Sequence, residues 1–163
     1  LKADPGEEWI SSIFWMLCTQ AAEIEVDIET GAIRVVKVAA AADVGKAINP
    51  MTVEQQIEGG VVMGLSNGIL EGFSFRDGRI ENGTLADYKV ATIQDLPEIV
   101  PIIVESVHDE APFGAKGVGE PAAAATPPAI ANALYDAIGV RIRDLPLTPE
   151  KVLEAMGELD AGE

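Results

Sequence analysis

The chain has 163 residues, of which 48% are hydrophobic, and a formal net charge of −16 from 27 acidic and 11 basic side chains. This composition excludes a disordered chain and is sufficient for one domain with a hydrophobic core. The acidic balance disfavours nucleic acid and anionic membrane surfaces as partners, because both attract lysine and arginine.

The sequence also lacks a membrane-spanning or targeting pattern. No apolar run approaches the roughly 20 residues of a transmembrane helix, and residues 1–8 are acidic, unlike the start of a signal peptide. We therefore expect a cytoplasmic protein. The one cysteine, Cys18, cannot form an internal disulfide, and the only histidine, His108, is too distant in sequence to suggest a catalytic thiol.

The first predicted element is a β-hairpin over residues 21–45. Apolar and acidic residues alternate over residues 23–29, which is the period of a half-buried strand. Thr30-Gly31 would provide the turn. The return strand is apolar on both faces, which predicts that it runs through the interior.

The second predicted element is a helix over residues 49–72, with Asn49 as N-cap and Pro50 at the first helical position. Four glycines lie inside it, and each costs about 1 kcal/mol relative to alanine. Two explanations stay open: close approach of another backbone or of a ligand, or tight packing of the helix on a sheet. These glycines are Gly59, Gly60, Gly64 and Gly68.

The rest of the chain mixes strands, loops and helices. We expect a hairpin turning at Asp77-Gly78, a loop over residues 85–99, a strand over residues 100–107, and helices over residues 121–139 and 148–156. The longer of these helices should be interrupted at Thr126-Pro127-Pro128.

This order of elements lacks a regular alternation of strand and helix, so the predicted fold class is α+β. We expect a mixed or antiparallel sheet with hairpins packed against helices. Residues 1–157 should form a single domain, and residues 158–163 an acidic tail.

A glycine-dense loop over residues 114–119 leads to Glu120 at the start of a predicted helix. Such a loop exposes backbone N–H groups, which suits an anionic or polar ligand. It matches neither the phosphate-binding loop nor the dinucleotide fingerprint. Two interpretations of Glu120 remain: a helix-end acid favoured by the helix dipole, or a general base that a ligand can approach because of the glycines.

A second polar cluster lies in the stretch DVGKAINPMTVEQQIEGG, residues 43–60. Gln55 and Gln56 fall in the first two turns of the predicted helix. Neutral amides can bind the edge of a heterocycle, which presents both donors and acceptors. The alternative is a pair of solvated glutamines.

Three stretches taken together resemble the molybdenum-binding subunits of the xanthine oxidase and aldehyde oxidase family of molybdenum hydroxylases. The resemblance covers residues 20–156, and the stretches occur in the same order as in the family. It implies the C-terminal part of a molybdenum-cofactor-binding domain within a larger subunit. The stretches are DVGKAINPMTVEQQIEGGVVMG, LADYKVATIQDLPEI, and GAKGVGEP followed by IANALYDAIGVRIRDLPLTPEKV.

The resemblance also implies roles for individual residues. Glu120 would be the active-site base, and Gly117, Val118 and Gly119 would line the cofactor pocket. Gln56 would contact the pyranopterin. No residue of the chain is expected to bind the metal directly.

The activity implied is hydroxylation of an aldehyde or N-heterocycle carbon with oxygen derived from water. The implied cofactor is molybdenum-pyranopterin in the cytosine dinucleotide form. The implied partners are the rest of the molybdenum subunit, an iron–sulfur subunit, an FAD subunit and a small-molecule substrate.

The sequence is short for such a subunit and begins without methionine, so we expect a truncated piece rather than a natural split subunit. Alone, it should hold no cofactor and show no turnover. The alternative is a non-catalytic fragment, or an interaction or scaffold domain that retains the fold without bound cofactor.

Overall fold

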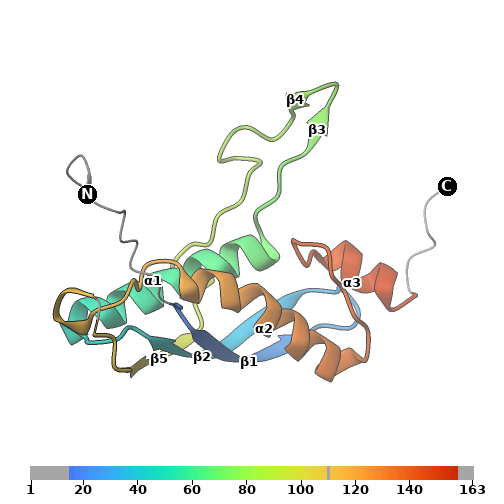
Figure 1. The fold of residues 1–163 in the computed structure, drawn as a ribbon. Helices are drawn as coiled ribbons and strands as arrows, with labels where there is room; N and C mark the ends of the chain where they lie inside the picture. The colour runs from blue at the N-terminus through green and yellow to red at the C-terminus, as the bar shows by residue number, and fades with distance from the viewer. Residues whose placement is uncertain (1–14, 110, 158–163) are drawn as a thin grey trace.

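A three-stranded mixed sheet forms the base of the fold in this computed structural model, which describes residues 15–109 and 111–157. The strand order is β1 (Cys18–Val26), β2 (Ile33–Asp43), β5 (Glu98–Val104). Helices α1 (Pro50–Ile69) and α2 (Pro121–Ile138) lie side by side on one face of this sheet (Figure 1). The α+β prediction, with a mixed sheet and hairpins against helices, is confirmed. The acidic tail predicted at residues 158–163 lies outside the described residues.

The β1–β2 hairpin is confirmed, but β1 ends three residues earlier than the alternating pattern predicts. The Asp27 side chain accepts hydrogen bonds from the N–H groups of Glu29 and Thr30 at 2.9 and 3.1 Å. This Asp-centred turn competes with strand pairing. Ile28 therefore lies in the turn and is 61% exposed, not on the buried face of the strand.

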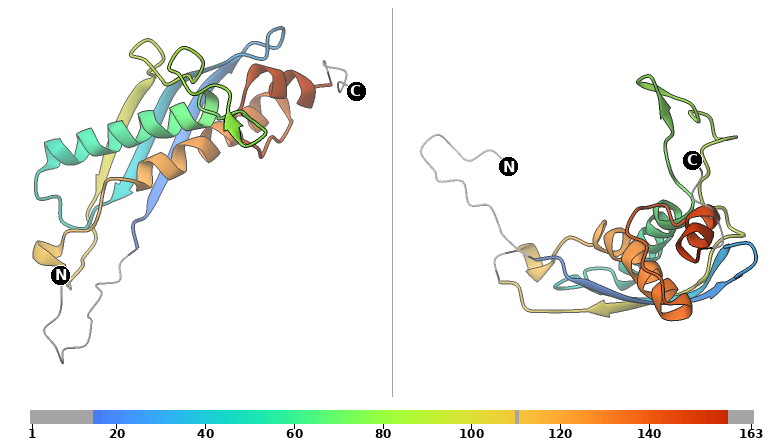
Figure 2. Two further views of the ribbon diagram at one scale, coloured as in Figure 1. Left: turned by 90° about the horizontal axis from the view of Figure 1, so that it is seen from above. Right: turned by 90° about the vertical axis from the view of Figure 1, so that its right-hand side faces the viewer.

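Strand β2 is the central strand, antiparallel to β1 and parallel to β5. Its position explains the apolar side chains on both of its faces, as the sequence predicted. Helix α1 lies over β5 and β2, and α2 lies over β1 (Figure 2). The core between helices and sheet consists of fully buried side chains from the sheet and from both helices, including Val38, Ala40, Ile57, Val61, Leu65, Ile130 and Leu134.

Helix α1 begins as predicted and packs through its glycines against α2. Asn49 accepts a hydrogen bond from the Thr52 N–H at 3.4 Å, which caps the helix. A Cβ atom placed on Gly64 would lie 2.5 Å from the Ala123 carbonyl oxygen. A Cβ on Gly60 would also lie close to α2, 2.8 Å from a side-chain carbon. Of the two explanations that the sequence left open, close approach of another backbone is the one observed.

Helix α2 is continuous, so the predicted interruption at Thr126-Pro127-Pro128 is wrong. The two prolines remove two N–H donors from the helix. The turn that precedes the prolines is attached to the sheet: Gln20 on β1 donates to the Ala122 carbonyl at 2.7 Å, and the Thr126 hydroxyl donates to Gln20 Oε1 at 2.8 Å. These bonds connect two elements more than 100 positions apart, which a local pattern does not reveal.

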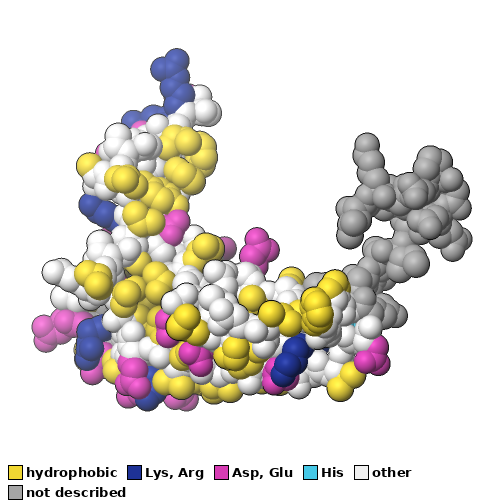
Figure 3. Space-filling model, turned by 90° about the vertical axis from the view of Figure 1, so that its left-hand side faces the viewer, with side chains coloured by type: hydrophobic (Ala, Val, Ile, Leu, Met, Phe, Trp, Pro, Cys, Tyr) yellow, Lys and Arg dark blue, Asp and Glu magenta, His cyan; other side chains and the backbone are white. Residues whose placement is uncertain are grey.

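Residues 70–97, here called the arm, project from the body of the molecule (Figure 1). The arm contains the predicted hairpin, with β3 (Phe75–Arg76) and β4 (Arg79–Ile80) joined by a turn with positive φ at Asp77 and Gly78. Hydrophobic side chains gather on its surface (Figure 3). Its exposed apolar residues include Phe73, Phe75, Ile80, Leu85, Val90 and Ile93.

The last helix, α3 (Pro149–Ala155), is also confirmed. Thr148 is its N-cap and accepts a hydrogen bond from the Lys151 N–H at 3.4 Å. Val152 and Leu147 are buried and attach this end of the chain to the core. Among the helices of the described residues, none combines the length and the hydropathy needed to span a bilayer.

Replacing Gly64 by alanine should destabilise the protein by about 1–3 kcal/mol, the usual cost of overpacking, because the new Cβ would collide with the backbone of α2. The matched control is Gly59→Ala on the same helix, where nothing lies within 4 Å of the new Cβ. This control should be neutral or raise stability by up to about 1 kcal/mol. Urea unfolding of the 163-residue protein measures both. Equal unfolding free energies for the two variants would contradict the close α1–α2 contact.

Candidate functional site

The glycine loop, residues 114–119, lies at the carboxyl ends of the parallel strands β2 and β5. Main-chain hydrogen bonds of 2.8 Å join Lys46 N–H to the Gly114 carbonyl and Lys116 N–H to the Val44 carbonyl. A Cβ on Gly45 would lie 2.2 Å from the Gly114 carbonyl oxygen, and Gly45 has φ +61°, so only glycine fits this position. The loop is thus held against the end of β2.

A buried ion pair fastens the middle of this loop. Lys116 Nζ lies 2.6 Å from Asp43 Oδ2, and both side chains are only 10% exposed. Ser106, just beyond β5, donates to the same carboxylate oxygen at 2.8 Å and accepts from Lys116 Nζ at 2.8 Å. The second carboxylate oxygen accepts the Gly45 N–H at 3.1 Å. Both oxygens of the Asp43 carboxylate therefore have a partner.

These contacts set the titration of Asp43. Burial raises the pKa of its carboxyl group, but hydrogen bonds from Lys116, Gly45 and Ser106, together with the Lys116 charge, outweigh burial. The net result is a pKa of about 2, below the ordinary 3.8. Asp43 is thus a stable anion in the folded protein at neutral pH.

A second, more exposed ion pair joins the segment after β2 to the segment after β5. Lys46 Nζ lies 2.9 Å from Glu105, whose carboxylate also accepts the Ala47 N–H at 2.8 Å. The Lys46 hydrogen bond, followed by the Ala47 N–H, lowers the pKa of Glu105. The first pair therefore joins the end of β2 to the glycine loop, and the second joins the segment after β2 to the segment after β5.

Glu120 occupies the N-cap position of α2, where its backbone has φ −111° and ψ −19°. Its side chain makes no capping hydrogen bond and is exposed. The carboxylate therefore does not fill the hydrogen-bonding role of an N-cap residue.

Gln56 and Gly119 are brought together, although they lie far apart in the sequence. The Gln56 side-chain oxygen lies 3.9 Å from the position that a Cβ on Gly119 would take. Gln56 is exposed on α1, and Gly119 directly precedes Glu120. The structure thus places two of the sequence-predicted cofactor-binding stretches next to each other and next to the predicted base.

The other two predicted residues, Gly117 and Val118, complete the loop. Val118 is partly buried and packs against the core, which leaves the main chain as the exposed part of this segment. Within residues 15–109 and 111–157, no acceptor receives a hydrogen bond from the N–H groups of Gly117, Val118 or Gly119. These three main-chain donors are therefore not used by other groups in the described part of the chain.

The second of the three stretches that resemble the family, residues 85–99, is not part of this arrangement. LADYKVATIQDLPEI lies mainly on the arm, which leaves the body at the opposite end of α1 (Figure 1). Helix α1 has 20 residues and so spans about 30 Å. Within this chain, the arm is too far from Gln56 to share its site.

Reasoning from the sequence missed the Asp43–Lys116–Ser106 cluster. The available signals were an aspartate at the end of an apolar strand and a lysine inside a glycine loop, both of which are usually solvent-facing. Within the described part of the chain, no group of three or more His, Cys, Asp or Glu side chains is arranged to hold a metal ion.

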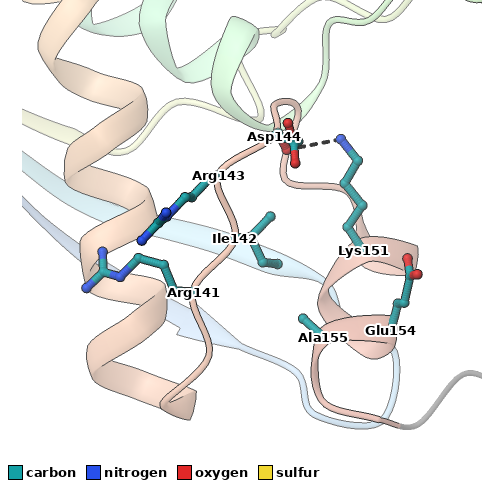
Figure 4. Close-up of a pocket in the computed structure, with 7 residues that line it drawn as sticks. All are labelled: Arg141, Ile142, Arg143, Asp144, Lys151, Glu154 and Ala155. Carbon is teal, nitrogen blue, oxygen red and sulfur yellow. Dashed lines mark hydrogen bonds between the residues drawn. The ribbon is translucent and has the colours of Figure 1, made fainter.

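A separate cavity is lined by residues 141–144, which follow α2, and by residues of α3 (Figure 4). Arg141 and Arg143 point toward α2, whereas Lys151 points toward Asp144 and donates to its main-chain carbonyl at 3.0 Å. None of the residues that line this cavity was predicted as a site residue. It is thus separate from the glycine loop.

Comparison with known proteins agrees with the resemblance. A family model described as a molybdopterin cofactor-binding domain matches residues 4–97. A probable xanthine dehydrogenase subunit from Bacillus subtilis (strain 168) is 35% identical over 136 residues, which are 83% of this chain and 18% of that protein. The aldehyde oxidoreductase molybdenum-binding subunit PaoC of Escherichia coli (strain K12) is 34% identical over 140 residues, 84% of this chain and 19% of that protein.

A solved structure gives the same result. Quinoline 2-oxidoreductase from Pseudomonas putida 86 superposes with a TM-score of 0.80 at 36% identity, over 85% of this chain and 18% of that chain. The fold is therefore that of a molybdenum-cofactor-binding domain. The chain belongs to the xanthine oxidase and aldehyde oxidase family of molybdenum hydroxylases, and it spans about a fifth of the length of the relatives it matches.

The low pKa of Asp43 predicts a specific loss of stability in acid. Because the folded-state pKa is depressed, the stabilisation is present above the ordinary pKa of 3.8 and is lost as the pH falls toward 2. The variant Asp43→Asn should be less stable than wild type at neutral pH, and its stability should fall less steeply between these pH values. Urea unfolding midpoints over this range measure the difference. Parallel profiles for the two proteins would contradict the assignment.

Proposed function

We propose that this chain supplies one wall of the active site of a molybdenum hydroxylase that acts on an aldehyde or N-heterocycle. Glu120 is the general base, and Gln56, Gly117, Val118 and Gly119 bind the cofactor. The observation that carries the proposal is the approach of Gln56 to Gly119, with 3.9 Å between the amide oxygen and the Cβ position of the glycine. Family membership and this juxtaposition support the same set of residues.

The groups present in the loop fit a pyranopterin. Its ring edges and phosphate offer acceptors for the N–H groups of the loop, and the Gln56 amide offers both a donor and an acceptor. The absence of side chains at Gly117 and Gly119 leaves room for a bulky ligand to approach the main chain. We expect the cytosine dinucleotide form of the cofactor. When bound, the molybdenum cofactor supplies the Lewis acid and the electron acceptor of the reaction.

Glu120 has the properties required of a base in this position. Its carboxylate is exposed and makes no capping bond, so it is available to accept a proton at either oxygen. Pro121 follows it at the first position of α2 and restricts the backbone. The loop therefore presents a carboxylate beside the main-chain donors that bind the cofactor.

The remaining walls of the site belong to other parts of the enzyme in this proposal. Glu120 is open to solvent in this chain, so exclusion of water requires further segments of the molybdenum subunit. The exposed apolar side chains of the arm support a contact surface for such segments. We expect iron–sulfur and FAD subunits as the further partners.

The variant Glu120→Gln, made in the intact molybdenum enzyme that carries this sequence, should lose about 10²–10⁴-fold in kcat, because the amide cannot accept the proton. Molybdenum content should stay at the wild-type level, since the change is isosteric. Glu29→Gln, in the exposed β1–β2 turn, is the matched control and should retain full activity. Retention of most of kcat in a molybdenum-loaded Glu120→Gln enzyme would refute the base assignment.

The isolated 163-residue protein should contain little or no molybdenum and show no hydroxylase turnover, because it offers only one wall of the site. Metal analysis of the purified protein, together with an assay on aldehydes and N-heterocycles, tests this. Bound molybdenum with turnover would overturn the expectation. The alternative, a non-catalytic interaction or scaffold domain, predicts in addition that Glu120→Gln has no effect in any complex that the chain forms.

A further inference from the structure

We infer that Asp43 and Lys116 are positioning residues that fix the segment from Gly117 to Glu120 for the reaction. The effect on the reaction rests on the proposed function. The positioning of the loop is argued only from contacts within this chain. The pair lies beneath the loop, and neither side chain is exposed enough to act on a ligand itself.

Several contacts fix the position of Lys116. Its ammonium group binds Asp43 at 2.6 Å and Ser106 at 2.8 Å, and its main-chain N–H binds the Val44 carbonyl at 2.8 Å. These partners come from the end of β2 and from the segment after β5. Lys116 is therefore attached to both parallel strands of the sheet.

The sheet also holds the chain on the other side of this segment, at the start of α2. Gln20 on β1 donates to the Ala122 carbonyl at 2.7 Å, within the first turn of α2. Residues 117–121 thus connect two points, Lys116 and Ala122, that are each bonded to a strand. The N–H groups of residues 117–119 have no acceptor among the described residues, so these two attachments, together with the packing of Val118 against the core, determine where Glu120 lies.

The Asp43–Lys116 pair is buried, so its formation costs the desolvation of two charges. Elsewhere in the described residues, the basic side chains that form ion pairs are 42–77% exposed, whereas Lys116 is 10% exposed. A buried ion pair contributes little net stability compared with apolar residues of similar volume, because both charges must be desolvated. A role in fixing geometry explains why such a pair occurs at the base of the glycine loop.

The test compares stability with local mobility in the 163-residue protein. The double variant Asp43→Asn with Lys116→Met removes both charges, and the new amide can still accept the Gly45 N–H and donate to the Ser106 hydroxyl, so it should unfold at a similar urea concentration to wild type. The loop should nevertheless become mobile. Backbone ¹⁵N order parameters of Gly117, Gly119 and Glu120 should fall from about 0.85 to below about 0.6.

The matched control is Lys46→Met, which removes the neighbouring exposed ion pair with Glu105. It should leave the order parameters of residues 117–120 unchanged, and Lys116→Arg should restore part of the rigidity that is lost in Lys116→Met. A folded double variant with a rigid loop would overturn the inference. Unfolding of the double variant would also overturn it, since the pair would then be required for the whole fold.

The proposed function and this inference can be tested separately. If Glu120→Gln leaves kcat intact while the double variant has a mobile loop, the base assignment is wrong and the positioning effect stands. If Glu120→Gln abolishes turnover while the loop of the double variant stays rigid, the base assignment stands and the positioning role is wrong.

Discussion

The close contact between α1 and α2 is the constraint on which the arrangement of this chain depends. Gly60 and Gly64 bring the backbones together, so that a single methyl group on Gly64 would overlap the main chain of α2. The same contact places the first half of α1 beside the start of α2. Gln56 and Gly119 meet for this reason, although each belongs to a different part of the sequence. The glycines of α1 thus allow close packing of the two helices, and this packing brings the residues of the candidate site together.

Elements specified by local chemistry could be predicted from the sequence. The N-caps Asn49 and Thr148, the turn at Asp77-Gly78 and the central strand of the sheet all agree with the structure. Each depends on residues within a few positions of one another, where side-chain hydrogen bonds and positive φ preferences act directly.

The predictions that failed, and the contacts that were not predicted, involve residues far apart in the sequence. Gln20 reaches α2 from β1 and bonds the turn that precedes the prolines, and the buried pair joins Asp43 to Lys116 across 73 positions. No local pattern contains such contacts, since they appear only once the strands and helices are packed. The roles of Glu120 and Gln56 likewise came from resemblance to a family. Local chemistry alone left a helix-end acid and a solvated amide open as alternatives.

The buried pair also separates this loop from a phosphate-binding loop, which it resembles in glycine content. In a phosphate-binding loop the lysine is free to contact the ligand, and its positive charge contributes to binding. Here the charge of Lys116 is neutralised by Asp43, and the ammonium group points into the protein. The loop therefore presents oriented N–H dipoles without a free cation, in a chain whose net charge is −16. Such a surface can bind a polar cofactor through main-chain donors, and the Lys116 charge, already paired with Asp43, is not available to pair with the Glu120 carboxylate.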